Sequence, residues 1–218
     1  MSDDLDRVYA RRFQDHHRAS KDRIWPPIVD YLRRYMVPGP VVDVGCDQGY
    51  FIRNVIATER WATDLRDASG ALASDIRFVQ ADGLRLDEVL PAEYFGVAFM
   101  SNYLEHLPSR DSVVEQFRVI HRILRPGGRV IVLQPNVRLI GGAFWDFIDH
   151  KVPLTERSLE EAAATAGLET CALVTRFLPY TTKSRLPQHP ALVRAYLAFP
   201  PAWWLMGKQT LYVGERPA

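Results

Sequence analysis

A run of acidic and glycine residues early in the chain is the segment best suited to hold a small ligand. The run Asp43-Val44-Gly45-Cys46-Asp47-Gln48-Gly49 ends the buried strand that residues 40–44 predict, and a helix is predicted next, at 50–57. Glycine lets the backbone approach a bound molecule, and the first turn of a helix offers free amide donors to a carboxylate. The run therefore predicts a ligand site at the carboxyl end of the first strand.

The same turn does not have the spacing of a dinucleotide-binding site. That fingerprint would place glycines at positions 45, 47 and 50, and this chain has Asp47 and Tyr50 at two of them. The sequence therefore argues against a nicotinamide-dependent dehydrogenase.

The elements that would position this turn alternate between strands and helices. Apolar runs predict strands at 40–44, 60–63, 76–80, 95–100, 129–133, 168–177 and 208–216. Between several of these strands the apolar residues follow helical spacing, as at 113–124. Such an alternation favours a parallel sheet with helices on both faces.

Two other helices are predicted outside this alternating core or near its end. One covers about residues 24–35, with Pro26 and Pro27 near its start, where missing amide donors cost least. The other begins near residue 155, with Ser158 and Glu161 as a capping box.

Composition limits the class of protein. The chain has 218 residues, of which 47% are hydrophobic and 24% charged, as expected for a single globular domain. No apolar run approaches the roughly 20 residues of a membrane helix, so no membrane association is expected. A net charge of +1 offers no basic surface for nucleic acid. Residues 1–13 lack the features of a secretory signal, which predicts a cytoplasmic location.

Several motifs in a fixed order resemble those of class I S-adenosylmethionine-dependent methyltransferases. The turn at 43–49 is similar to the family's first motif, and Asp64 stands where the family has the acid that holds the ribose hydroxyls. Asp82-Gly83 occupies the adenine-edge position, and Ser101-Asn102-Tyr103-Leu104-Glu105-His106-Leu107 looks like the segment that lines the cofactor near the methyl donor. The LRPGG sequence at 124–128 resembles the turn before the fifth strand. The resemblance spans about residues 40–170.

The resemblance implies a Rossmann-like α/β fold: a mostly parallel seven-stranded sheet, helices on both faces and an antiparallel last strand. It also implies S-adenosylmethionine as the cofactor and S-adenosylhomocysteine as the product. Asp47 departs from the family, which often has glycine there, so this position is expected to have a positive φ, which aspartate tolerates better than most other residues. Its carboxylate would either pair with the ammonium group of the cofactor or face solvent. The cofactor-binding residues implied are Asp43, Gly45, Cys46, Asp47, Gly49, Asp64, Leu65, Asp82, Gly83, Ser101 and Asn102.

Two histidines are candidates for a catalytic base. Methyl transfer from a sulfonium is an in-line displacement that depends mainly on alignment, so no metal is expected, and Cys46 and Cys171 lack metal-ligand spacing. A hydroxyl acceptor would be helped by a base. His150 is the first candidate, because the segment from Asp149 onwards resembles one in which many small-molecule methyltransferases carry a histidine, and His106 is the second. Either histidine could instead only hydrogen-bond a loop.

The acceptor is expected to bind beyond the fifth strand. The residues predicted to contact it are Asn136, Arg138, Trp145, Asp149 and Tyr180. The sequences around 134–136 and 176–187 look like those of methyltransferases associated with sugar, glycan or natural-product biosynthesis. The resemblance therefore implies methylation of a hydroxyl on a small polar acceptor. An N-methyltransferase and a non-catalytic protein that binds S-adenosylmethionine and a partner are the alternatives.

The chain is divided into a helical cap at 1–38, a cofactor-binding core at 39–176 and an aromatic insertion at 177–207. One helix is predicted at about 190–206 within this insertion. Its aromatic residues, among them Trp203 and Trp204, could be buried at the edge of the core, in a homodimer, or in a lid over the acceptor formed with Tyr180 and Lys183.

Overall fold

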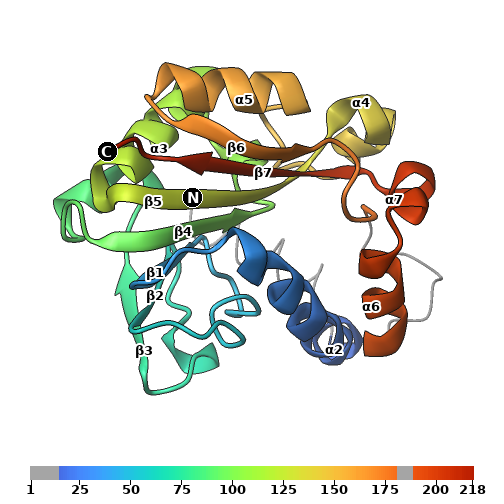
Figure 1. Ribbon diagram of the computed structural model, residues 1–218, viewed down its shortest axis with the longest axis horizontal. Coiled ribbons are helices and arrows are strands. Elements are labelled where there is room, and N and C mark those ends of the chain that lie inside the picture. The colour runs from blue at the N-terminus through green and yellow to red at the C-terminus, as the bar shows by residue number, and fades with distance from the viewer. Residues whose placement is uncertain (1–14, 181–188) are drawn as a thin grey trace.

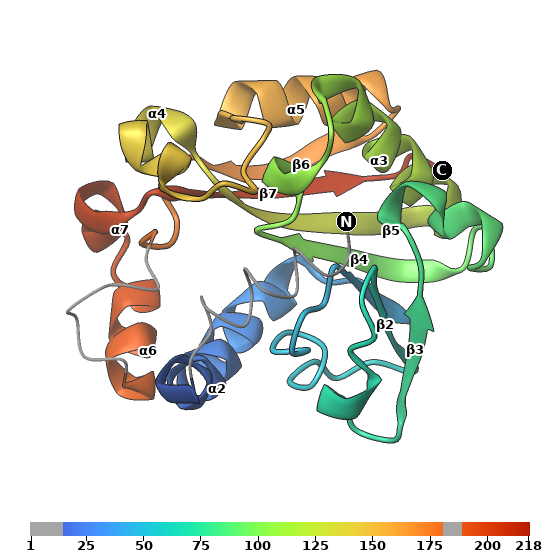
Figure 2. The same cartoon turned by 180° about the vertical axis from the view of Figure 1, so that it is seen from behind.

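One seven-stranded sheet forms the centre of the protein, and a computed structural model describes residues 15–180 and 189–218 of it (Figures 1 and 2). The strand order is β3-β2-β1-β4-β5-β7-β6. Neighbouring strands from β3 to β5 are parallel, and β7 is antiparallel to both β5 and β6. The predicted fold, mostly parallel with an antiparallel last strand, is confirmed. The strands are β1 (Val41–Val44), β2 (Arg60–Asp64), β3 (Ile76–Gln80), β4 (Phe95–Ser101), β5 (Leu124–Pro135), β6 (Glu169–Val174) and β7 (Gln209–Glu215).

Helices cover the two faces of the sheet unequally. On one face α3 (Arg110–Ile123) and α5 (Glu156–Thr165) lie side by side, while α2 (Asp15–Leu32), α6 (Pro190–Ala198) and α7 (Pro200–Met206) lie on the other side (Figures 1 and 2). Side chains of a strand alternate between the faces. In β4, Ala98 and Met100 therefore join the core under α3, and Val97 and Phe99 join the core under α2. The short elements are η1 (Arg33–Tyr35), η2 (Ser69–Ala71), η3 (Gly83–Glu88), η4 (Leu104–His106), α4 (Val137–Ile140) and η5 (Gly141–Asp146).

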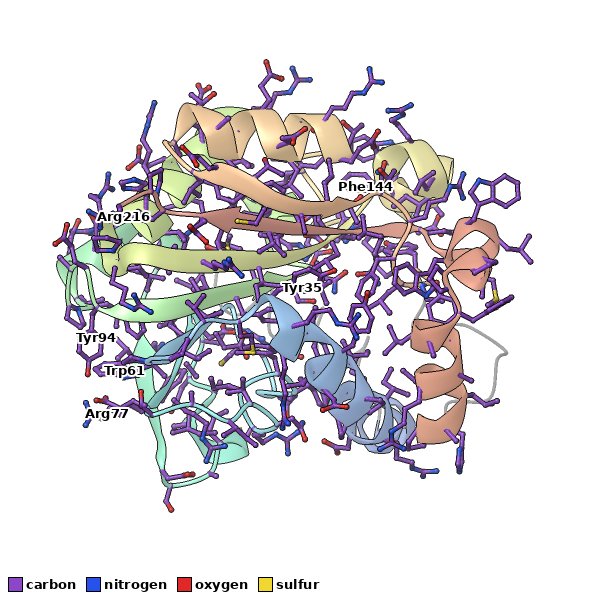
Figure 3. The ribbon with its side chains drawn as sticks, in the orientation of Figure 1. Tyr35, Trp61, Arg77, Tyr94, Phe144 and Arg216 are labelled. Atoms are coloured by element: carbon purple, nitrogen blue, oxygen red, sulfur yellow. The ribbon has the colours of Figure 1, made fainter. Side chains whose placement is uncertain are left out.

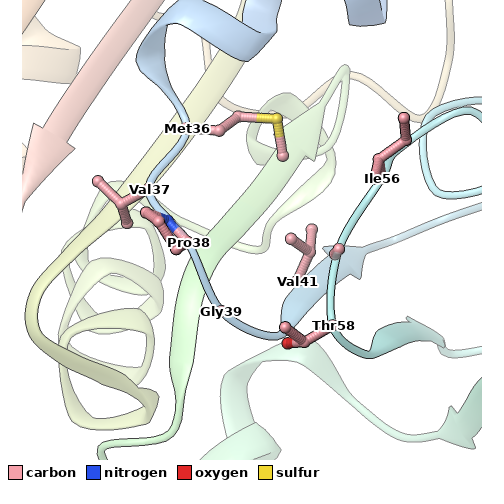
Figure 4. Close-up of a pocket in the computed structure, with 8 residues that line it drawn as sticks. Met36, Val37, Pro38, Gly39, Val41, Ile56 and Thr58 are labelled. Carbon is pink, nitrogen blue, oxygen red and sulfur yellow. The ribbon is translucent and has the colours of Figure 1, made fainter.

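The amino-terminal ends of the parallel strands are occupied by structural contacts. Tyr94, Trp61 and Arg77 gather at this end in Figure 3, where the Tyr94 hydroxyl donates to Glu59 at 2.6 Å and the Arg77 guanidinium lies 5.0 Å from the Trp61 ring. A hollow of about 380 Å³ beside Val41 is lined mainly by apolar side chains and backbone (Figure 4). These contacts serve the fold, and the larger cleft lies at the opposite, carboxyl-terminal ends of the parallel strands.

The helix predicted at 50–57 is wrong, because residues 47–54 form successive turns. A helix would need the Asn54 amide to bond the carbonyl of Tyr50. Instead the Asn54 side chain donates to that carbonyl at 2.8 Å, and the Asn54 backbone amide bonds Phe51 at 3.0 Å. The side chain thus competes with the backbone, as asparagine often does. No helix start faces the ligand turn in this part of the chain.

Details of three other predicted helices need correction. Pro26 and Pro27 lie inside α2, because that helix begins at Asp15, well before the predicted start. Helix α5 begins near residue 155, as predicted, but its capping box is formed by Thr155 and Ser158, one turn before the predicted pair. The predicted helix at 190–206 is two helices, which break at Phe199 because the residue before a proline disfavours helical angles. No helix of the described residues is long and apolar enough to cross a membrane.

Candidate functional site

A cleft of about 1340 Å³ opens at the carboxyl ends of the parallel strands. It lies where β1 and β4 are neighbours and the chain leaves them toward opposite edges of the sheet, the usual ligand position in open α/β folds. Residues of α2, α6 and α7 line it on one side, and residues after β4 and β5 line it on the other. Most residues predicted for the cofactor and both predicted catalytic histidines line this one cleft.

The turn after β1 forms the first part of the cleft. Gly45 and Gly49 have φ of 68° and 67°, and Asp47 has φ of 48°, as expected for that position. The amides of Gly45 and Cys46 both donate to the carbonyl of Thr63, at 2.8 and 2.9 Å, which ties the turn to the end of β2. The backbone of the turn is thereby held open toward the cleft without a following helix.

Asp43 lies at the base of this turn and is only 4% exposed. Burial raises the pKa of its carboxyl group to about 8, a backbone hydrogen bond from Ile52 opposes this shift, and the nearby carboxylates of Asp64 and Asp47 add to it. Burial likewise raises the pKa of the Cys46 thiol. Both side chains line the cleft, and burial favours the neutral, protonated form of each.

The carboxylate of Asp64 stands at the end of β2, at the edge of the cleft. Its two oxygens accept the backbone amides of Asp47 and Arg66, each at 3.0 Å. An ionised carboxylate has about four lone-pair positions, so it can still accept two hydroxyl donors. The guanidinium of Arg66 also binds the carboxylate of Asp47 at 3.2 Å, so Asp47 has a cationic partner in the chain itself.

Tyr103 lines the cleft, and the sequence placed it in the segment that lines the cofactor without naming it as a binding residue. A Cβ added at Gly45 would lie 2.5 Å from the Tyr103 ring, and one added at Gly83 would lie 1.9 Å from its hydroxyl. The hydroxyl donates to Gln116 at 2.8 Å. The position of the Tyr103 ring therefore favours glycine at both positions, whether or not a ligand also approaches the backbone there. A tyrosine in a loop after a strand carries no local signal of such a role.

The other residues predicted for the cofactor also line the cleft. Asp82 accepts the amide of Leu84 at 3.0 Å and so caps η3. The Asn102 side chain donates to the Ser101 hydroxyl at 3.0 Å, and Asn102 has φ of 49°. Leu65 is 59% exposed at the rim. Gly49 is the exception among the predicted residues, because it does not line the cleft and the space beside its Cα is taken by Leu72.

Four titratable side chains gather at the other end of the cleft: Glu105, His106, Asp149 and His150. The Nδ1 atom of His106 lies 3.3 Å from the Asp149 carboxylate and 3.2 Å from the Asp149 carbonyl. Nδ1 of His150 lies 2.9 Å from the carbonyl of Phe144, and the two imidazole rings are 5.0 Å apart. Burial raises the pKa of Glu105, which is 1% exposed. The structure thus brings both predicted catalytic histidines together with Asp149.

Three residues predicted to contact the acceptor do not line the cleft. The Asn136 side chain is buried and donates to Glu156 at 2.7 Å and to Thr210 at 3.1 Å. Arg138 pairs with the same glutamate at 2.5 Å. Trp145 is 60% exposed on η5, outside the cleft. Asn136 and Arg138 are therefore structural residues that join the end of β5 to α5.

Two elements outside the predicted core supply the remaining wall of the cleft. Lys21 and Trp25 reach it from α2, and burial lowers the pKa of Lys21 while the nearby Asp47 carboxylate opposes that shift. Tyr196 and Phe199 line it from the predicted insertion, as does Tyr180. Trp203 is buried against the sheet instead, so the insertion serves both the core and the cleft; Lys183 lies outside the described residues.

Comparisons with known proteins agree with this geometry. A family model described as a methyltransferase domain matches residues 13–173. A solved Thermotoga maritima S-adenosylmethionine-dependent methyltransferase, named a possible histamine N-methyltransferase, is 13% identical with a TM-score of 0.67 over 96% of this chain and 98% of that one. The Streptomyces coelicolor geranyl diphosphate C-methyltransferase, solved with Mg²⁺, geranyl diphosphate and S-adenosylhomocysteine, is 14% identical with a TM-score of 0.60 over 87% and 76%.

A third similar structure is an Archaeoglobus fulgidus S-adenosylmethionine-dependent methyltransferase, 16% identical with a TM-score of 0.58 over 86% of this chain and 92% of that one. No curated protein sequence matches the chain. At these identities the solved structures show the shared fold, while the family model covers most of the chain. The chain therefore belongs to the methyltransferase-domain family, and its cofactor is S-adenosylmethionine.

Proposed function

We propose that this protein transfers a methyl group to a hydroxyl oxygen of an acceptor bound at the His106 and His150 end of the cleft. The observation that carries the proposal is the pair of imidazoles, each held at Nδ1 by an oxygen atom and both lining the cleft that contains the cofactor turn. An oriented imidazole is the side chain best suited to take a proton near neutral pH.

The residues at the β1 and β2 end fit the cofactor. The turn at 45–47 exposes backbone to the cleft, and the Asp64 carboxylate has capacity for both ribose hydroxyls. Lys21 would pair with the carboxylate of the methionine part, since its ammonium group lies in the same cleft near Asp47. When bound, the cofactor supplies an electrophilic methyl group on a sulfonium.

The two imidazoles share one protonation pattern. A carbonyl oxygen accepts and cannot donate, so Nδ1 of His150 carries the proton that faces Phe144. The same reasoning applies to Nδ1 of His106 between two oxygens of Asp149. In the neutral form each Nε2 then holds a lone pair and can accept the hydroxyl proton. His106 is the more accessible of the two, with 24% of its side chain exposed.

The walls of the cleft favour an acceptor with an apolar body. Ile24, Trp25, Phe147, Leu178 and Phe199 are among the side chains that surround it. A sugar would need polar partners along its whole length, whereas an apolar molecule that carries one hydroxyl would match walls of this kind. A hydroxylated natural-product intermediate therefore fits better than a free sugar.

The proposal is tested by release of S-adenosylhomocysteine from the purified protein. A panel of aromatic and isoprenoid alcohols would be paired with the amines of the same carbon skeletons. We expect turnover with alcohols and an O-methyl product by mass spectrometry. Turnover restricted to the amines would show N-methylation instead. Tight binding of S-adenosylmethionine with no turnover on the whole panel would favour a non-catalytic partner protein.

A further inference from the structure

We propose that Glu105, His106 and His150 form a binding site for a first-row divalent metal ion at the acceptor end of the cleft. One ligand atom from each of the three residues lies within 4.8 Å of the others. The inference goes beyond the proposed methyl transfer, because ion binding requires neither cofactor nor acceptor. It also differs from the sequence analysis, which expected a reaction without a metal.

The orientation of the two histidines is that of metal ligands. In metal sites the nitrogen that does not bind the ion usually donates to a carboxylate or a backbone carbonyl, which fixes the tautomer. His106 has both kinds of acceptor at Nδ1, from Asp149, and His150 has the carbonyl of Phe144. Each Nε2 is thereby the nitrogen with the lone pair. Asp149 would act as an outer partner that positions His106.

Glu105 would supply the negative charge of the proposed site, because a bound cation would offset the burial that raises the pKa of its carboxyl group. Its side chain is 1% exposed, and Oε2 makes no hydrogen bond of standard geometry within the part of the chain that the structure describes, although Gln134 lies close enough to lower the pKa. The other oxygen, Oε1, lies 4.0 Å from Nε2 of His106. A buried carboxylate is costly unless it is paired, and an imidazole nitrogen with a lone pair cannot donate to it. A cation between these atoms would compensate the buried carboxylate.

The backbone holds the three ligands in place. The carbonyl of Glu105 accepts the amides of Lys151 and Val152, at 2.8 and 3.1 Å, so the segment after η5 is fixed against η4. Zinc binds imidazole nitrogen and carboxylate oxygen at about 2.0–2.2 Å, which sets neighbouring ligand atoms roughly 3.4 Å apart in a tetrahedral site. The widest of the present separations must therefore contract by about 1.4 Å, which rotation of the three side chains would have to supply.

The donor set determines the kind of ion. Two imidazoles and one carboxylate suit Zn²⁺, Fe²⁺ or Co²⁺, whereas Mg²⁺ prefers oxygen ligands and water. Three protein ligands leave a coordination position open, as in catalytic zinc sites. A hydroxyl in that position would have its pKa lowered by the ion, and the imidazoles would then serve as ligands and not as bases.

Metal binding can be measured on the untagged full-length protein after dialysis against a chelator. We expect isothermal titration with Zn²⁺ to give one site per chain, and Co²⁺ to give the visible absorption of a nitrogen- and oxygen-bound ion that Zn²⁺ removes. Glu105→Gln and His150→Asn should each weaken Zn²⁺ binding at least about 10-fold, the usual effect of altering a metal site. Mg²⁺ should not displace Co²⁺.

His121→Gln is the matched control, because His121 lies on α3 and does not line the cleft. It should leave Zn²⁺ affinity unchanged. Circular dichroism and S-adenosylhomocysteine binding of each variant would separate loss of the ion from loss of the fold. The proposal is overturned if the wild type binds no Zn²⁺, or if folded Glu105 and His150 variants bind it as tightly as the wild type. Either result would decide whether the two imidazoles act as ligands or as bases, but not whether the protein transfers a methyl group, which release of S-adenosylhomocysteine tests separately.

Discussion

The two ends of the cleft are built from different kinds of structural element. The end beside β1 and β2 is formed by backbone turns with positive φ and by carboxylates at the ends of strands, held by hydrogen bonds from neighbouring amides. The end beyond β4 and β5 is formed by side chains from short helices and from α6, an element distant in sequence, while α2 contributes Lys21 near Asp47 at the first end. The first end depends on local chain geometry, and the second depends on how separate segments pack.

This difference separates cofactor binding, at the first end, from acceptor choice and turnover, at the second. A site made from strand ends is fixed by the sheet and can serve any reaction that uses the same cofactor. A site made from the side chains of η4, η5 and α6 can change with a few substitutions while the sheet stays the same. We therefore expect substitutions at the first end to change cofactor affinity and those at the second to change turnover or acceptor choice.

The largest expected effect is at the acceptor end. His150→Ala should lower turnover by about 10²- to 10⁴-fold, because it removes a base or a ligand at the reacting group. The affinity for S-adenosylmethionine should stay nearly unchanged, as measured by calorimetry. His121→Gln should keep wild-type turnover. A His150→Ala protein with near-full activity would make His150 a loop-stabilising residue and would weaken the contrast between the two ends.

The pH dependence of the free energy of unfolding should reveal whether Asp43 is protonated in the folded protein. Its folded-state pKa of about 8 lies above the unfolded value, so the folded protein holds a proton that the unfolded chain has lost. Stability from this group is therefore greatest below pH 4 and is lost as pH rises toward 8, by up to about 1.4 kcal/mol per pH unit. Asp43→Asn should flatten the dependence of unfolding free energy on pH between 5 and 8, measured by urea denaturation. An unchanged slope would mean that Asp43 is ionised in the folded protein.

At the cofactor end, Asp64→Ala should weaken binding of S-adenosylhomocysteine by about 1.5–3 kcal/mol, the range for hydrogen bonds to a charged group. Asp67→Ala is the control, because Asp67 is exposed outside the cleft and accepts the nearby amide of Ser69. Calorimetry on both variants gives the comparison. Equal affinities of the Asp64 variant and the wild type would remove this carboxylate from the site.

The smallest effect is expected at Trp204, for which the neighbouring Trp203 is the buried comparison. Trp204→Ser should change the free energy of unfolding by less than about 0.5 kcal/mol, because this side chain is 74% exposed. Trp203→Ser should cost about 3–5 kcal/mol, because Trp203 is packed in the core and donates to the carbonyl of Tyr196. Light scattering of the Trp204 variant also tests the homodimer proposed from the sequence. A lower mass than the wild type would place Trp204 in an interface.

The strands and the cofactor turn could be predicted because their signals are local. Apolar runs followed by an acid or a glycine mark β1 and β2, and the ends of these strands meet the cleft as expected. The roles of Asn136 and Arg138 could not be predicted, since their partner Glu156 lies on another element. Nothing in the order of residues shows that α2 would bring Lys21 to the cleft.

Tyr103 links three parts of the chain that the sequence keeps separate. Its ring fills the space left by the missing side chains of Gly45 and Gly83, and its hydroxyl reaches Gln116 on α3. The choice of residue at each of these positions therefore depends on the others. In related chains we expect an alanine or a larger residue at position 83 only together with a smaller residue at position 103. Engineering of the adenine side of this cleft must accordingly change both positions in the same variant.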